Sequence, residues 1–306
     1  MRPLKYTAGP ADEGLPVRHV LTEVFQMSSS HISRLKRRPG GILLNGEPCY
    51  VTAGLREGDV VEALICDPPD TKTLEPMEAP LDVVYEDEWL IVVNKAAGIS
   101  VHPERSGIGG SLENALTARL APGEFVHTVS RLDRWTSGLM TVAKSGYMHE
   151  RMIRLLHTPD FVKEYRAVCE GVPQPGAGFI RLPIGHPEGE NYRMQVRADG
   201  LPSLTEYEVL YSRGRRSFLR LLPHTGRMHQ LRVHMAAAGC PLTGDWLYGT
   251  EIPEMPGPAL HSYRLRFLHP MTHELKELFA PVPECFEKLL NAPQNIWNPT
   301  APKCVI

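Results

Sequence analysis

The stretch CDPPDTKTLEPMEAP, residues 66–80, predicts that this 306-residue chain folds as two separate parts. It is rich in proline and acidic residues and poor in apolar ones, a composition typical of an extended linker. Apolar residues make up 42% of the chain, which is ample for a buried core. We therefore predict a small unit over residues 1–66, a linker over 67–80, a larger unit over 81–295 and a C-terminal tail over 296–306.

The small unit combines a short basic helix with strands joined by tight turns. In MSSSHISRLKRRPGG, residues 27–41, serines suit the start of a helix, Ile32 and Leu35 share one side, and Pro-Gly-Gly ends it. The other side of this helix carries Arg34, Lys36, Arg37 and Arg38. Asn45-Gly46 and Glu57-Gly58-Asp59 then separate short apolar runs, as hairpin turns do.

The larger unit mixes strand-like runs with helical patterns. Two strand-like runs lie within residues 81–103, and four more cover 161–171, 203–211, 216–224 and 258–270. Helical spacing occurs in GYMHERMIRLLH and in RMHQLRVHMAAAG, which Gly239 ends. The strict strand–helix alternation of a doubly wound fold is missing. We predict the α+β class, with a mixed, largely antiparallel sheet and flanking helices, beside a small α/β-hairpin module.

Charge is distributed unevenly along the chain. The net charge is −2, but residues 129–232 hold sixteen lysines and arginines against ten acidic residues. A local surplus of this kind suits either a polyanionic partner or an ordinary solvated face, because binding to phosphates depends on the cations that contact them. The average charge therefore does not exclude nucleic acid.

The cysteines and the N-terminus point to an intracellular setting. The six cysteines lie far apart without a CxxC pair, so neither a zinc ribbon nor a disulfide framework is indicated, and we expect reduced thiols. MRPLKYTAGPADEG lacks the apolar stretch of a signal peptide, and no window resembles a membrane span. We expect a cytoplasmic protein with no membrane partner.

Residues 127–145, HTVSRLDRWTSGLMTVAKS, set Asp133 between Arg131 and Arg134, ahead of an apolar run. Tyr165 lies in KEYRAV, and Arg227 lies in LLPHTGRMHQLRVH. Taken singly, these residues fit a surface ion pair and ordinary strand packing.

In order along the chain, four segments resemble the successive motifs of RluA-type RNA pseudouridine synthases. They are NKAAGISVHP, SRLDRWTSGLMTVAKS, VKEYRAVCEG and LLPHTGRMHQLRVHMAAAGCPLTGDWLYG, and LHSYRLRFLHP continues the match. The resemblance covers roughly residues 81–285. In the first unit, LLNGEPCYVTAGLREGDVV is similar to a small RNA-binding module named after a small-subunit ribosomal protein, which is common in this family, whereas GLPVRHVLTEVF departs from its usual start.

The resemblance implies that the protein isomerises specific uridines of structured RNA, ribosomal or transfer, to pseudouridine. It implies that Asp133 is the catalytic aspartate and that Arg131 fills the space vacated by a flipped base. Tyr165 would stack on the uracil or take its carbon-5 proton, and Leu231 would form an apolar wall of the uracil pocket. Arg227 is our candidate for holding the aspartate ionised. The RNA-binding module would contribute Arg34, Lys36, Arg37 and Arg38.

Two positions in these motifs depart from the family pattern, and a third residue has two possible roles. Many family members read HRLD and NKPAG, where this chain has Ser130 and Ala96. Trp135 either stacks on an RNA base or packs within its own loop. The sequence also leaves open whether Asp133 attacks the sugar or the base.

Other functions fit the sequence less well. HExxH, GxSxG, GxxxxGK and GxGxxG are absent, and His229 and His234 lie five residues apart, so we expect no metal and no nucleotide cofactor. One alternative is a non-catalytic RNA-binding protein, an RNA chaperone or assembly factor, on the same scaffold. Another is a hydrolase built on Ser137, His127 and Asp133. We expect a monomer.

Overall fold

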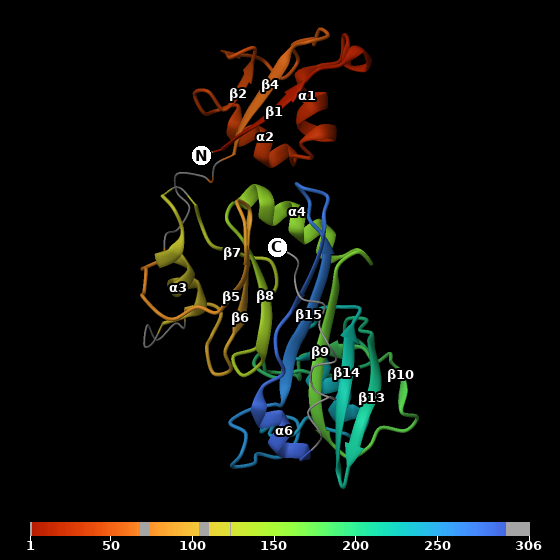
Figure 1. Cartoon of the computed structure of the whole chain (residues 1–306). Coiled ribbons are helices and arrows are strands. Elements are labelled where there is room, and N and C mark those ends of the chain that lie inside the picture. Colours follow the sequence, from red (N-terminus) through yellow and green to blue (C-terminus); the bar gives the residue numbers. More distant parts are fainter. Residues whose placement is uncertain (1, 66, 68–73, 104–109, 123, 292–306) are drawn as a thin grey trace.

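The computed structural model describes residues 2–65, 67, 74–103, 110–122 and 124–291. Its N-terminal module is a four-stranded sheet in the order β1-β4-β2-β3, with helices against it (Figure 1). The strands are β1 (Arg2–Thr7), β2 (Ile42–Leu44), β3 (Glu47–Pro48) and β4 (Val60–Ile65). The helical elements are the 3₁₀ turn Pro10–Asp12, α1 (Val17–His19) with a π-helical continuation over Val20–Val24, and α2 (Ser29–Leu35).

The predicted helix start and hairpin turn of this module are confirmed. Ser28 caps α2 by accepting a hydrogen bond from the His31 backbone amide. Asn45 and Gly46 have φ of 53° and 83° and join β2 to β3, because a two-residue hairpin turn of this type needs left-handed backbone at both positions. The segment with the weaker match forms α1 and its π-helical continuation.

A ten-stranded sheet forms the larger part of the molecule. Its main path is β10-β13-β14-β9-β15-β8-β6-β5, with β16 beside β15 and β7 beside β8. The strands are β5 (Val83–Glu86), β6 (Leu90–Lys95), β7 (His127–Thr128), β8 (Ser137–Ala143), β9 (Val162–Glu170), β10 (Ala177–Ile180), β13 (Thr205–Arg213), β14 (Arg216–Pro223), β15 (Leu260–Leu268) and β16 (Leu275–Phe279). Among these pairs only β8 and β15 run parallel, so the mixed, largely antiparallel prediction is confirmed. A separate hairpin pairs β11 (Ile184–Gly185) with β12 (Gln195–Val196).

Helices cover both faces of the large sheet. They are α3 (Leu112–Arg119), α4 (Gly146–Leu156), α5 (Gln230–Ala237) and α6 (Glu284–Leu290). On β6, Ile91 and Val93 pack in the cluster that contains residues of α3 and α5, whereas Leu90 and Val92 pack with residues of α4. Period-two alternation thus fills a core on each face, which explains why the strand has few polar positions.

The N-terminal module is docked on α4 (Figure 1). Tyr147 of α4 is buried in the module's own apolar cluster and donates its hydroxyl to the Phe25 carbonyl at 2.7 Å. Arg151 donates to the same carbonyl at 3.1 Å, and Arg154 donates to the Gln26 carbonyl at 2.9 Å. The two parts therefore share buried contacts.

The described part of the predicted linker does not extend freely. The Met77 amide donates to the Asn114 carbonyl in α3, and the Asn114 side chain donates to the Glu75 carbonyl. Residues 68–73 and the predicted tail 296–306 lie outside the described residues, so the domain limits stay predictions. Within the described ranges, no helix is long and apolar enough to cross a bilayer.

Candidate active site

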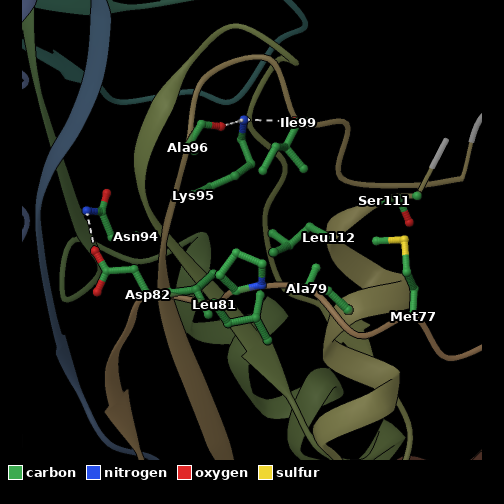
Figure 2. A pocket seen from close by; sticks show the side chains of 14 residues that line it. Met77, Ala79, Leu81, Asp82, Asn94, Lys95, Ala96, Ile99, Ser111 and Leu112 are labelled. Atoms are coloured by element: carbon green, nitrogen blue, oxygen red, sulfur yellow. Dashed lines mark hydrogen bonds between the residues drawn. The ribbon is translucent and has the colours of Figure 1, made fainter.

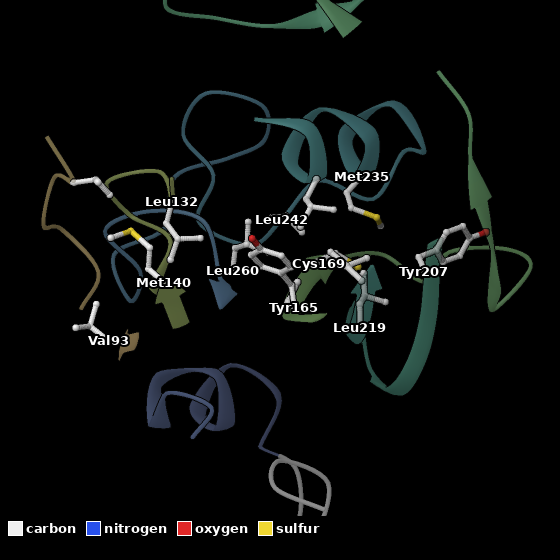
Figure 3. Close-up of a cluster of buried hydrophobic side chains, with 14 of the residues drawn as sticks. Val93, Leu132, Met140, Tyr165, Cys169, Tyr207, Leu219, Met235, Leu242 and Leu260 are labelled. Atoms are coloured by element: carbon white, nitrogen blue, oxygen red, sulfur yellow. The ribbon is translucent and has the colours of Figure 1, made fainter. Parts of the chain in front are cut away.

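Asp133 lies in the loop between β7 and β8. Its neighbour Leu132 is buried in the same apolar cluster as Tyr165 (Figure 3). Arg131 is exposed, and the Asp133 side chain is 28% exposed. Burial of Leu132 anchors the loop, while the arginine before it and the carboxylate after it remain accessible to a ligand.

Lys95, at the end of β6, fixes the loop from behind. Its buried ammonium group donates to the carbonyls of Ala96, Ile99 and Arg134, each at 3.0 Å. Figure 2 shows the first two of these contacts. Burial lowers the pKa of Lys95 to about 8, and the negative charge of Asp133 partly opposes this shift. The backbone next to the carboxylate is therefore tied to β6.

Gly138 explains the TSG sequence after the loop. Its φ is 104°, and a Cβ built there would lie 2.3 Å from the Ser262 carbonyl oxygen. Only glycine lets β8 approach the parallel strand β15 this closely. The strand that follows Asp133 is thereby placed in the centre of the sheet.

The partner of Asp133 is Arg232, in the first turn of α5. Arg232 Nη1 lies 3.2 Å from Asp133 Oδ2, while Nε and Nη2 each bind the fully buried Asp245 at 2.8 Å. Burial tends to lower the pKa of Arg232, but its hydrogen bonds and the two negative charges outweigh burial and raise it. Asp245 thus orients a guanidinium that remains cationic beside Asp133.

This arrangement corrects the expectation for Arg227. Arg227 Nε donates to the Pro202 carbonyl at 3.4 Å, and the guanidinium that contacts Asp133 belongs to the residue five positions later. The physical reason is the start of α5: Gln230 binds the Arg227 amide and the Thr225 hydroxyl, which leaves Arg227 before the helix. Sequence reasoning missed Arg232, whose signal was a charged residue within the apolar run LRVHMAAA.

Tyr165 and Leu231 form the apolar side of the site. Both are buried and belong to one cluster with Leu132. Burial raises the pKa of Tyr165, and the negative charge of Asp133 raises it further, so the phenol is protonated at neutral pH. The site therefore joins a charged pair to an apolar wall.

Other candidate residues have different surroundings. Trp135 is half-buried, and Cβ atoms built on Gly98 and Gly257 would lie 3.1 Å and 2.5 Å from it, which favours packing over base stacking. Ser137 Oγ lies 2.8 Å from Nδ1 of His261. His127 instead contacts Asp67, so the Ser-His-Asp arrangement is not formed.

The four cations of the N-terminal module differ in surroundings. Arg34 Nη2 is 3.8 Å from Glu150 of α4 and 3.2 Å from His31 Nδ1. Lys36 and Arg37 follow the end of α2 and are exposed, and Arg38 is half-buried. Ser130 is half-buried, and Ala96 supplies a carbonyl to Lys95.

A cavity of about 500 Å³ lies between the end of the predicted linker, β6 and α3 (Figure 2). Met77, Leu81, Val93 and Leu112 are among its lining residues, and Asp133, Tyr165 and Arg232 are not. Across the described ranges, His, Cys, Asp and Glu side chains form no group of three that could hold a metal ion.

Comparisons with known proteins identify the family to which this chain belongs. Residues 89–237 match the family model described as RNA pseudouridylate synthase. The chain is 35% identical, over 89% of its length and 87% of the relative, to the ribosomal large subunit pseudouridine synthase D of Xanthomonas campestris. It is 34% identical to an uncharacterized RNA pseudouridine synthase of Bacillus subtilis, over 86% of this chain and 94% of that one.

Among solved structures, a human RNA pseudouridylate synthase domain containing 1 protein superimposes with a TM-score of 0.55. The match has 29% identity and covers 69% of this chain and 90% of that chain. The chain thus belongs to the RluA-type RNA pseudouridine synthase family and is an enzyme that isomerises uridine in RNA.

Proposed function

We propose that Asp133 is the catalytic carboxylate of this synthase and that Arg232 keeps it ionised. The supporting observation is the chain of contacts Asp245–Arg232–Asp133, which ends at a partly exposed carboxylate beside the apolar Tyr165 and Leu231. In a protein that only binds RNA, a carboxylate at this place would be unfavourable, because it repels phosphates. The presence of Asp133 beside a guanidinium therefore favours catalysis over binding alone.

The reaction breaks the bond between the ribose C1′ and uracil N1 and forms a bond between C1′ and C5. The C5 proton leaves and N1 gains a proton, so the product is an isomer and no redox carrier is consumed. A stacked uridine hides these atoms, and we propose that the exposed Arg131 fills the gap left when the nucleotide is flipped.

We propose ribosomal RNA of the large subunit as the substrate, with transfer RNA as the alternative. The first choice rests on relatives from Xanthomonas campestris and Haemophilus influenzae that are named ribosomal large subunit pseudouridine synthase D. We further propose that the N-terminal module binds RNA, and that the enzyme acts as a cytoplasmic monomer.

The test uses ribosomal and transfer RNA carrying tritium at uracil C5. Wild-type protein should release tritium to water from one RNA fraction, because each turnover removes the C5 hydrogen. Asp133→Asn keeps the size of the side chain but removes its charge, so release should fall more than about 100-fold while RNA affinity changes only a few-fold. RNA binding without tritium release by the wild type would instead support the non-catalytic alternative.

A further inference from the structure

His229 has a left-handed backbone conformation, which is uncommon for residues other than glycine. It is the last residue before α5, and its φ of 53° and ψ of 17° lie in the left-handed region. For a residue with a Cβ this region is disfavoured, and such positions persist where the surrounding structure requires them. The side chain is 15% exposed and faces Asp133.

Both ring nitrogens of His229 have neighbours. Nδ1 lies 2.8 Å from the Tyr248 hydroxyl, and Nε2 lies 3.7 Å from Asp133 Oδ2. The Tyr248 oxygen accepts a hydrogen bond from the Met194 amide at 2.9 Å. Because the amide can only donate, the phenol's single proton is available for Nδ1. A neutral imidazole that accepts at Nδ1 carries its proton on Nε2, on the side of Asp133.

The side-chain hydrogen bond of Asp133 uses one oxygen. Arg232 Nη1 and His229 Nε2 both approach Oδ2. Within the described residues, no hydrogen bond reaches Oδ1. Oδ2 is therefore the anchored oxygen, and Oδ1 is the oxygen available to a substrate.

We propose that His229 is a positioning residue: its Nε2–H, fixed by Tyr248, helps Arg232 hold Asp133 Oδ2 and leaves Oδ1 to react. This inference rests on the proposed role of Asp133. It adds that the β11–β12 hairpin, through the Met194 amide, sets which nitrogen of His229 carries the proton.

The charges around His229 come from several elements. Asp133, Arg232, Asp245 and His186 all act on it electrostatically. Burial lowers the pKa of His229, and the charge of Asp133 opposes this, so the ring is neutral at pH 7. A neutral ring has one proton, which makes its placement by Tyr248 decisive.

The first test replaces His229 in three ways and measures single-turnover tritium release and RNA affinity. His229→Leu should slow release about 10- to 100-fold with RNA affinity within about threefold, because a misoriented group costs this much. His229→Gln, whose amide can donate near the Nε2 position, should recover most of the rate. His229→Gly removes the ring but suits the left-handed backbone, so it should fold and should react as slowly as the Leu variant.

The second test uses Tyr248→Phe, which frees the neutral ring to place its proton on Nδ1. Nε2 would then present a lone pair to Asp133, and protonation of the ring at lower pH would restore the donor. The rate of Tyr248→Phe divided by that of wild type should therefore rise as pH falls from 8 to well below the ordinary histidine pKa of about 6.5, because burial shifts protonation of the ring to lower pH. His186, present in both proteins, cancels in this ratio. Tyr211→Phe, on β13, is the matched control and should give a flat ratio.

The outcomes separate the inference from the proposed function. No tritium release by wild-type protein would refute the proposed function itself. Active wild type with an equally active His229→Leu, a slow His229→Gln, a fast His229→Gly, or a flat Tyr248→Phe ratio would overturn the positioning role.

Discussion

Arg232 binds two carboxylates at once, which a lysine at the same position could not do in the same way. Arg232→Lys keeps a positive charge, but one ammonium group cannot reproduce the paired bonds to Asp245 and the bond to Asp133. We expect the single-turnover rate to fall about 10- to 100-fold. Arg227→Ala, before the helix, should leave that rate within a few-fold. A slow Arg227→Ala beside a normal Arg232→Lys would refute the assignment.

The substitution Tyr165→Phe removes the hydroxyl of Tyr165 and keeps its ring, so it tests the two groups separately. The ring should continue to support the uracil, so RNA affinity should be nearly unchanged. Asp133 contributes to the raised pKa of the phenol, and that contribution ends once the carboxylate has bonded to substrate or taken a proton. The phenol then gives up its own proton to water more readily, and the resulting phenolate can take the C5 proton, so loss of the hydroxyl should slow turnover by about 10² to 10⁴. Near-normal tritium release by Tyr165→Phe would leave Tyr165 as a wall of the pocket only.

Sequence patterns could indicate Asp133 and Tyr165 because each lies inside a motif with a fixed order along the chain. They could not separate Arg232 from Arg227, since both belong to one basic segment. The difference arises only when α5 brings Arg232 against Asp245, thirteen residues away, and against a loop 99 residues earlier. Residue spacing relates His229 only to the question of a metal site, because its backbone angle and its contact with Tyr248 cannot be derived from spacing.

The strands can be predicted from local sequence patterns, but their order in the sheet cannot. Apolar alternation predicts β9, β13, β14 and β15; three of them form within the expected ranges, and β13 extends two residues beyond its predicted end at residue 211. The parallel neighbours β8 and β15 are joined by a long connection, so their pairing depends on contacts remote in sequence. Gly138 is the residue that permits this pairing.

Gly138→Ala should therefore destabilise the fold. The new Cβ would meet the Ser262 backbone at 2.3 Å, and a φ of 104° disfavours any side chain. We expect the free energy of unfolding in urea to fall by at least about 2 kcal/mol. Gly176→Ala is the control, because a Cβ there meets nothing within 4 Å, and its stability should change by less than about 1 kcal/mol. Equal stabilities of the two variants would contradict this account of β8.

Docking of the N-terminal module on α4 gives its cations different surroundings. The sequence predicted the basic helix but not that α4 would contribute Tyr147 to the module's core. In the docked state Arg34, although exposed, lies 3.8 Å from Glu150, whereas Lys36 and Arg37 are exposed beyond the helix and Arg38 is half-buried. Four cations that look equivalent in the sequence therefore differ in their neighbours and in their exposure.

Replacing Arg34, Lys36, Arg37 and Arg38 together by alanine should weaken RNA binding without changing the single-turnover rate at saturating enzyme. Each lost phosphate contact should flatten the slope of log affinity against log salt by about 0.7 to 0.9. Because Arg34 pairs with Glu150, Lys36→Ala with Arg37→Ala should account for most of that change, and Arg34→Ala alone for little. Titrations of labelled ribosomal RNA at several salt concentrations give the slopes directly. An unchanged slope in the fourfold variant would mean that this end of the module faces away from the RNA.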